Sequence, residues 1–212
     1  MESLRGSVQR ADDETLDRLS ERVKRTRSGM HRVLVVGSGG AGKSTFAARL
    51  ASRTGLPLIH LDSCYWREGW VATPQEEWTQ RVNELVRGAE WVMDGNYGGT
   101  LDSRIAACDT MVFLDMPRLV CMWRVIRRWW RYRGRSRPDM TPGCNEQLTL
   151  EFLRWIWEYP ATRRPDILRR LAALRPDQHG IVLRSPADVE AFFSALSRDG
   201  AEETGVAARD VQ

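Results

Sequence analysis

The stretch that decides the fold is residues 33–45, which read VLVVGSGGAGKST. It contains the pattern G-x-x-x-x-G-K-[S/T], with Gly37, Gly42, Lys43 and Ser44 at the fixed positions. A short apolar strand precedes the pattern and a helical pattern follows it. This is the context in which such a glycine-rich turn binds phosphate, so the stretch predicts a P-loop and the α/β fold of P-loop NTPases.

The residue types in this loop have separate tasks. Glycines let the chain turn so that successive backbone N–H groups point at one anion. We expect Lys43 to reach the β- and γ-phosphates of a nucleotide, and the Ser44 hydroxyl to ligate Mg²⁺. The residues predicted to hold the nucleotide are Gly37, Ser38, Gly39, Gly40, Ala41, Gly42, Lys43, Ser44 and Thr45.

Short apolar runs alternate with helical patterns along most of the chain. The runs are Arg32–Val36, Pro57–Leu61, Glu90–Met93, Thr110–Leu114 and Gly180–Leu183. Helical patterns begin at Lys43 and after Pro74, Pro117 and the pair Ser185-Pro186. Strands that alternate with helices predict βαβ units and hence a parallel sheet.

The same patterns define the expected domain organisation. We expect an N-terminal extension over residues 1–30, one P-loop domain over 31–198 and a flexible tail over 199–212. In the extension, Leu16, Leu19 and Val23 recur at helical spacing, so it is either a short amphipathic helix or a mobile segment. Residues 119–175 carry no strand pattern, and we expect them to form a helical lid over the carboxyl edge of the sheet.

Composition excludes several classes of protein. The chain has 212 residues, of which 42% are hydrophobic and 28% charged, so it can form a packed core and is not disordered. No apolar run approaches the roughly 20 residues that span a bilayer, and no secretory signal is visible, so we expect a cytoplasmic protein with no membrane partner. Its cysteines, Cys64, Cys108, Cys121 and Cys144, form no C-x-x-C pair, which argues against zinc and disulfides.

Three aspartates follow predicted strands, namely Asp62, Asp94 and Asp115. The carboxyl ends of parallel strands meet at one edge of the sheet, where ligands bind. A carboxylate there can hold magnesium-bound water, orient a substrate hydroxyl or cap the following helix. We expect Asp94 to act on the water of Mg²⁺, and Asp62 to orient the accepting hydroxyl or to take its proton. Capping is the simplest interpretation of Asp115, because a proline and a helix follow it.

Positive charge gathers at the start of the predicted lid, where residues 118–137 hold eight arginines and no acid. On a helix, one face takes Arg124, Arg127, Arg128 and Arg131. The opposite face takes Leu119, Trp123, Ile126 and Trp130. We expect this apolar face to lie in the core.

The basic face is either a solvated surface or a clamp for a polyphosphate, which would relieve the repulsion between like charges. Given the P-loop, we expect a clamp. The residues expected to close over the transferring phosphoryl group are Arg128, Arg131, Arg137 and Arg164.

Aromatic residues follow Asp62 in residues 65–70, which read YWREGW. They either stack on a ring of the phosphate acceptor or pack the lid against the sheet. The residues expected to line the acceptor pocket include Asp62, Trp66, Asn96 and Tyr97.

Several segments, taken in order, resemble one family. They are VLVVGSGGAGKST, PLIHLDSCYWREGW, WVMDGNYGGTLDSR, VFLDMPR, RGRSRPDM and EFLRWIW. They fall within residues 31–197 and together resemble the adenylate-kinase-like P-loop proteins often labelled DNA topology modulation proteins. The resemblance implies an adenylate-kinase-like, five-stranded parallel sheet flanked by helices, an arginine-rich lid, and ATP with Mg²⁺ as cofactors.

One segment departs from the pattern of nucleotide kinases. Residues 93–97 resemble their Asp-Gly-Phe-Pro-Arg stretch, but Phe-Pro-Arg is absent. That arginine would grip a phosphate of the acceptor. Either Arg104 substitutes for it as a further residue of the acceptor pocket, or the acceptor carries no phosphate there, which makes AMP doubtful.

The sequence therefore predicts an ATP-dependent phosphotransferase that acts on a nucleotide, a nucleoside or another small hydroxyl compound. One alternative is a nucleotide-gated, DNA-associated protein whose face from Arg124 to Arg137 meets backbone phosphates. Another is an NTPase switch. A nucleic-acid partner is not favoured, because the chain has no helix-turn-helix or zinc module.

Overall fold

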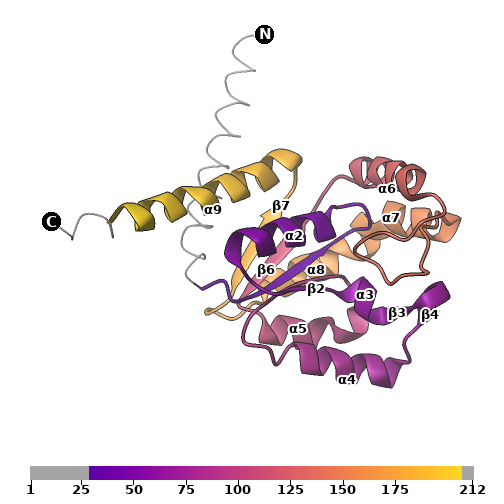
Figure 1. Ribbon diagram of the computed structural model, residues 1–212, viewed down its shortest axis with the longest axis horizontal. Coiled ribbons are helices and arrows are strands. Elements are labelled where there is room, and N and C mark those ends of the chain that lie inside the picture. The colour runs from indigo at the N-terminus through magenta and orange to yellow at the C-terminus, as the bar shows by residue number, and fades with distance from the viewer. Residues whose placement is uncertain (1–28, 207–212) are drawn as a thin grey trace, which may run out of the picture. The chain divides into compact units, whose positions relative to one another are not determined.

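The computed structural model describes residues 29–206, with side chains up to residue 197. It divides into two compact units, each described by itself. The larger unit is His31–Arg184, and the other contains the C-terminal helix α9 (Pro186–Val206) (Figure 1). The helical spacing of Leu16, Leu19 and Val23 lies outside the described residues.

Five parallel strands form the centre of the larger unit, in the order β2-β5-β1-β6-β7. Their bounds are β1 Arg32–Gly37, β2 Leu58–His60, β5 Trp91–Asp94, β6 Thr110–Leu114 and β7 His179–Leu183. The predicted parallel sheet is confirmed, with small shifts at the strand ends. β1 pairs with β5 on one side and with β6 on the other, so the loop that follows β1 lies between the ends of both neighbours.

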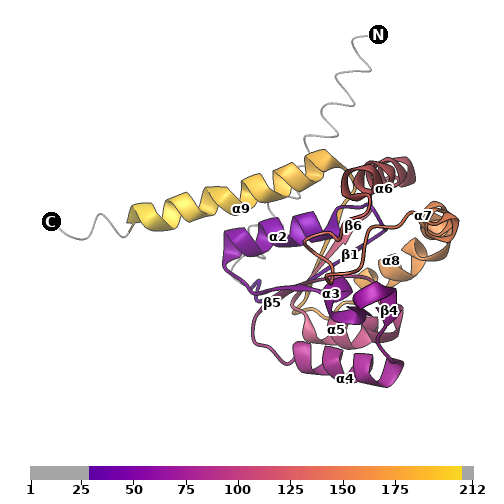
Figure 2. The same ribbon diagram turned by 45° about the vertical axis from the view of Figure 1, so that its right-hand side comes forward.

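Helices cover both faces of the sheet. Those of the larger unit are α2 Lys43–Thr54, α3 Leu61–Tyr65, α4 Gln75–Leu85, α5 Leu101–Ala107, α6 Arg118–Tyr132, α7 Leu150–Thr162 and α8 Arg164–Ala172. Both views place α2 on one side of the sheet and α4 and α5 on the other (Figures 1 and 2). Leu34 and Val36 of β1 join Trp78 of α4 and Leu101 of α5 in one core cluster. Alternate residues of the strand face the other side, as the period of a strand requires.

The region predicted as a lid consists of α6, α7, α8 and an irregular loop over residues 133–149. α7 begins at Leu150, where Thr149 caps it by accepting the N–H of Phe152 at 3.1 Å. Pro160 lies inside α7, in its last turn. So close to the end of a helix, a proline removes one backbone bond and leaves the preceding turns intact.

Sequence patterns missed several short elements. A hairpin of β3 (Trp66–Arg67) and β4 (Val71–Ala72) follows α3, with the 3₁₀ turn Glu68–Trp70 between its strands. A second 3₁₀ turn, Gly98–Thr100, precedes α5. The helices α3 and α5 were also not predicted, because neither is long enough to show a clear helical period.

The apolar face of α6 is exposed, and the prediction that it lies in the core is wrong. Leu119, Trp123, Ile126 and Trp130 are 67%, 58%, 43% and 71% exposed. The buried residues of α6 are Cys121 and Val125. They face the P-loop so closely that a Cβ on Gly40 would collide with the carbonyl of Cys121. Only small side chains fit this approach, so the tryptophans turn outward.

α9 begins where the sequence predicts. The Ser185 hydroxyl accepts the N–H of Asp188 at 3.1 Å, and the carboxylate of Asp188 accepts the N–H of Ser185 at 3.2 Å, which makes a reciprocal cap. The helix continues to Val206, so residues 199–206 of the predicted tail are helical. Within residues 29–206, no helix combines the length and the apolar character that crossing a bilayer requires.

We expect one cysteine to react readily in the folded protein. Cys108, Cys121 and Cys144 are buried, whereas Cys64 is half-buried. Burial raises the pKa of Cys108 to about 12 and also raises that of Cys121, which disfavours the reactive thiolate. Titration with Ellman's reagent should detect a single fast thiol, which Cys64→Ser removes, and all four after denaturation. Several fast thiols in the native protein would contradict this packing.

Candidate active site

The P-loop, residues 37–45, turns tightly between β1 and α2. Gly42 caps α2 with a φ of +97°, a left-handed conformation that glycine adopts without strain. Helix α7 also approaches the loop, since a Cβ on Gly39 would lie 2.7 Å from the ring of Phe152. The backbone of the loop and the first turn of α2 therefore form an enclosed cradle of N–H groups, the kind of site that binds anions.

Lys43, the first residue of α2, is half-buried beside this cradle. Its ammonium donates to the carbonyl of Ser38 at 3.0 Å, which uses one of its three N–H donors. Burial lowers the pKa of Lys43, the carboxylates of Asp62 and Asp94 oppose that shift, and Arg128 reinforces it. Residues from three elements, α3, β5 and α6, thus act electrostatically on a single ammonium group. Ser44 is half-buried beside it, and Thr45 is exposed.

Asn96 supports the P-loop from the end of β5. Its side-chain carbonyl accepts the N–H of Gly37 at 3.2 Å, and its amide donates to the carbonyl of Gly37 at 2.8 Å. We expected Asn96 in the acceptor pocket, but both ends of its amide hold the backbone of the first P-loop glycine. The sequence carried no signal for this contact, because it depends on β5 lying next to β1.

A histidine and an aspartate meet at the ends of β2 and β5. His60 and Asp94 are register partners, and Nδ1 of His60 lies 2.7 Å from Oδ1 of the buried Asp94. The hydrogen bond to Asp94 raises the pKa of His60, against the opposing effect of burial. The two residues were not paired from the sequence, although each lies within one residue of the end of a predicted strand. Strand ends in adjacent register were the signal that could have found the pair.

Asp62 lies in the first turn of α3 and accepts a hydrogen bond from the hydroxyl of Tyr97 at 2.7 Å. Burial and the neighbouring Asp62 carboxylate raise the pKa of Tyr97 well above its usual value, so its hydroxyl stays protonated. The rings of Tyr65, Trp78 and Tyr97 pack together with centroids 4.6–5.0 Å apart. Trp66 packs edge-on against Tyr65 at 4.9 Å. Of the expected acceptor residues, Trp66 and Tyr97 therefore belong to one aromatic cluster, and Asp62 is hydrogen-bonded to it through Tyr97.

Arg104 is completely buried and holds the loop that follows β5. Its guanidinium donates to the carbonyl oxygens of Gly95, Asn96, Tyr97 and Thr100. Burial lowers its pKa to about 10, so the group remains charged at neutral pH. Arg104 was expected to line the acceptor pocket, but its donors are directed to the backbone and none of its surface is accessible.

The lid arginines Arg128 and Arg137 share the carboxylate of Glu146, whose side chain is 2% exposed. Nε of Arg128 lies 2.8 Å from one oxygen and Nε of Arg137 lies 2.8 Å from the other. Arg137 also binds Asp139 at 2.9 Å. The acid that residues 118–137 lack is thus supplied by the following loop. Glu146 was not among the expected site residues, because its contacts with these arginines span that loop.

Both arginines belong to the same electrostatic neighbourhood as the P-loop. Arg128 lowers the pKa of Lys43, and Asp139, the partner of Arg137, raises that of His60. Arg124, which was not among the expected site residues, donates to the carbonyl of Ala41 in the P-loop at 3.0 Å.

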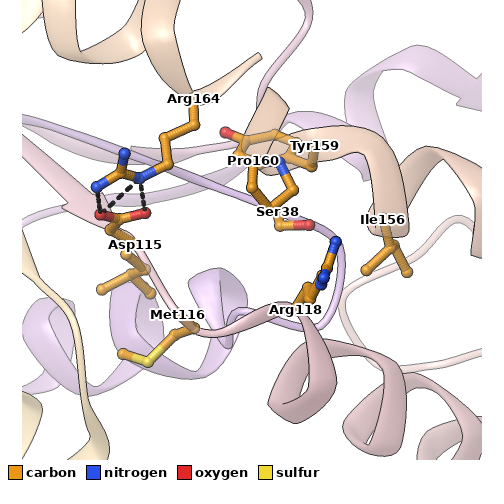
Figure 3. Close-up of a pocket in the computed structure, with 9 residues that line it drawn as sticks. Ser38, Asp115, Met116, Arg118, Ile156, Tyr159, Pro160 and Arg164 are labelled. Carbon is orange, nitrogen blue, oxygen red and sulfur yellow. Dashed lines mark hydrogen bonds and ion pairs between the residues drawn. The ribbon is translucent and has the colours of Figure 1, made fainter. Parts of the chain in front are cut away.

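Arg131 and Arg164 do not join this group. Arg131 is exposed on α6, with its guanidinium 5.8 Å from the ring centre of Tyr132. Arg164 binds the carboxylate of Asp115 through Nε and Nη2 at 2.8 Å and 2.9 Å (Figure 3). Asp115 therefore anchors α8 to the end of β6 and does not cap α6, whose cap residue is Pro117.

A small pocket adjoins this ion pair (Figure 3). Ser38, Arg118, Tyr159 and Arg164 are among its lining residues. The Tyr159 hydroxyl is buried and has no hydrogen-bond partner within residues 29–206. The space admits about one water molecule, so it fits an ordered water and not a nucleotide.

The loop over residues 133–149 is fastened to the hairpin that follows Asp62. Thr141 donates to the carbonyl of Trp66 at 2.6 Å, and Nε1 of Trp70 donates to the carbonyl of Asn145 at 2.8 Å. At least Trp70 of the aromatic segment therefore packs the lid region, which was one of the two interpretations of that segment.

No known family profile matches the chain, and no curated protein sequence matches it. Solved structures of several kinases resemble it. Shikimate kinase from Acinetobacter baumannii in complex with shikimate has 16% identity and a TM-score of 0.51, over 89% of this chain and 99% of that one. A gluconokinase from Sinorhizobium meliloti 1021 has 16% identity and a TM-score of 0.45, over 82% and 95%. A sugar kinase from Janibacter sp. HTCC2649 has 20% identity and a TM-score of 0.44, over 79% and 93%. The likeness to the shikimate kinase shows that the two chains share a fold.

Replacing Arg104 should destabilise the whole domain. Arg104→Ala would leave several buried carbonyls without donors, so we expect the free energy of unfolding to fall by at least about 3 kcal/mol in urea titrations. Arg81→Ala, which removes an exposed arginine from α4, is the matched control and should change stability by less than about 0.5 kcal/mol. Equal effects of the two substitutions would refute the role assigned to Arg104.

Proposed function

We propose that this chain is an ATP-dependent kinase that phosphorylates a small hydroxyl compound. The observation that carries the proposal is the half-buried ammonium of Lys43, which begins the helix after a P-loop and is influenced by Asp62, Asp94 and Arg128. Phosphoryl transfer depends mainly on positioning and charge neutralisation, and this arrangement supplies both. The fold shared with a shikimate kinase is compatible with the same chemistry.

The donor phosphates would lie along residues 37–45, with Lys43 on the β- and γ-phosphates. Mg²⁺ bound with a nucleotide takes most of its ligands from phosphates and water, so one or two protein groups are enough. Ser44 and, through water, Asp94 fit that requirement. When bound, the ion would neutralise charge on the phosphates. The hydrogen bond from His60 fixes the orientation of the Asp94 carboxylate.

Asp62 would orient the accepting hydroxyl and take its proton. One of its oxygens already accepts the hydroxyl of Tyr97, which holds the carboxylate in place. Arg128 and Arg137 would neutralise the charge that develops on the transferring group. Both bind Glu146, whose carboxylate offsets the repulsion between the two like charges.

We further propose that the acceptor carries no phosphate. The stretch that replaces Phe-Pro-Arg offers no arginine, and Arg104 is committed to the backbone. The surroundings of Asp62 are the aromatic rings of Tyr65, Trp66 and Tyr97. Such rings suit a nucleoside or a sugar-like polyol better than a nucleoside monophosphate.

The DNA-associated alternative has less support. It needs a continuous basic face on α6, but Arg124 binds the P-loop and Arg128 binds Glu146. Half of the predicted face is therefore directed into the protein.

Lys43→Met should abolish transfer while leaving the fold intact. We expect loss of ATP binding by calorimetry and a fall in kcat/KM of at least about a hundredfold, because the ammonium neutralises the β- and γ-phosphates. Arg81→Met, an exposed site on α4, serves as the control and should keep wild-type activity. Full activity of the Lys43 variant would refute the proposal.

The acceptor is identified by measuring ADP release from ATP in the presence of nucleosides, sugars, polyols and nucleoside monophosphates. Release that depends on an unphosphorylated hydroxyl compound is the expected result. Release that depends only on a monophosphate would contradict the proposed acceptor class. ADP release unaffected by any acceptor would instead indicate a nucleotide switch.

A further inference from the structure

The exposed apolar side chains of α6 form one continuous surface. We call Leu119, Trp123, Ile126 and Trp130 the α6 stripe. They recur at intervals of three and four residues, so they lie in a line along one side of the helix. Single exposed apolar residues are normal, but a contiguous set with two tryptophans marks an interaction surface.

Arginines border the α6 stripe. Arg127, Arg131 and Arg133 are exposed, and none has an acidic partner within the described part of the chain. Their contacts are with rings instead, since Arg127 lies 5.0 Å from the ring centre of Trp123 and Arg133 lies 5.4 Å from that of Trp129. The surface therefore combines an apolar centre with uncompensated positive edges.

This combination selects among possible occupants. A symmetric contact with a second copy would bring the arginines of the two copies close together, and α6 has no acidic residue that could neutralise them. A single-stranded nucleic acid would stack on the tryptophans, but Leu119 and Ile126 offer no ring for stacking. A lipid surface uses all of the residues, because aliphatic groups and indoles enter the interface while arginines meet anionic headgroups.

We propose that the α6 stripe binds the surface of a membrane that contains anionic lipids. No described helix can cross a bilayer, but binding at the surface does not require crossing, because α6 would lie along the plane of the membrane. The buried side of α6 holds Cys121 and Val125 against the P-loop, and Arg124 donates to Ala41. The side facing lipid and the side facing the P-loop are different, so the nucleotide site remains accessible in the bound state.

The full chain is tested by co-sedimentation with vesicles of phosphatidylcholine alone and with vesicles in which phosphatidylglycerol replaces a large part of it. We expect binding to the second kind only, weakened by salt. Trp123→Ser with Trp130→Ser, and separately Arg127→Glu with Arg133→Glu, should each lower the partition coefficient at least about tenfold.

Val71→Ser is the matched control, because Val71 is 55% exposed on β4, outside α6, and should bind as the parent does. Circular dichroism checks that every variant is folded. Failure of the parent to bind anionic vesicles, or undiminished binding by both double variants, overturns the proposal. So does a dimer that the tryptophan variant dissociates in the absence of vesicle binding, or a preference for single-stranded DNA over vesicles.

Discussion

The candidate active site is organised around one half-buried ammonium group, that of Lys43. Taking the charge of Lys43 partly out of water is costly, and the opposing carboxylates of Asp62 and Asp94 limit that cost. Each acid stands at the end of a different strand, so the sheet order that places β5 next to β1 and β2 is what gathers them. The position of Lys43 beside these two carboxylates therefore depends on this order of strands.

The lid region solves the opposite electrostatic problem. Its first helix carries arginines without local acids, and Glu146 supplies the compensating carboxylate from the loop beyond. Moving either arginine away would leave the buried carboxylate of Glu146 without full compensation, and removing Glu146 would leave the two arginines without an anion. In the proposed function, a polyphosphate would therefore compete with Glu146 for the same two arginines.

Several side chains have positions that no linear pattern carries. Asn96 and Arg104 are residue types that often bind ligands, yet the side chains of both form hydrogen bonds with backbone groups of the same domain. Their partners lie across strand and loop boundaries, so distance along the chain conceals the contacts. The pairing of His60 with Asp94 was easier to predict, because both residues end strands and those two strands are neighbours in the sheet. Periodicity separated the apolar from the basic residues of α6, but the side of α6 that is buried holds Cys121 and Val125, which belong to neither set.

By itself, the sequence determined the P-loop, the parallel strands and the concentration of arginine after β6. Each is written in residues that are close along the chain, where turn chemistry and side-chain period act directly. The tertiary structure decided the rotation of α6, since the carbonyl of Cys121 approaches Gly40 too closely for a bulky side chain. It also decided which arginines reach the site, because Arg128 and Arg137 find Glu146 whereas Arg164 finds Asp115. Both outcomes depend on how elements far apart in the sequence pack against one another, and that packing exists only in the folded chain.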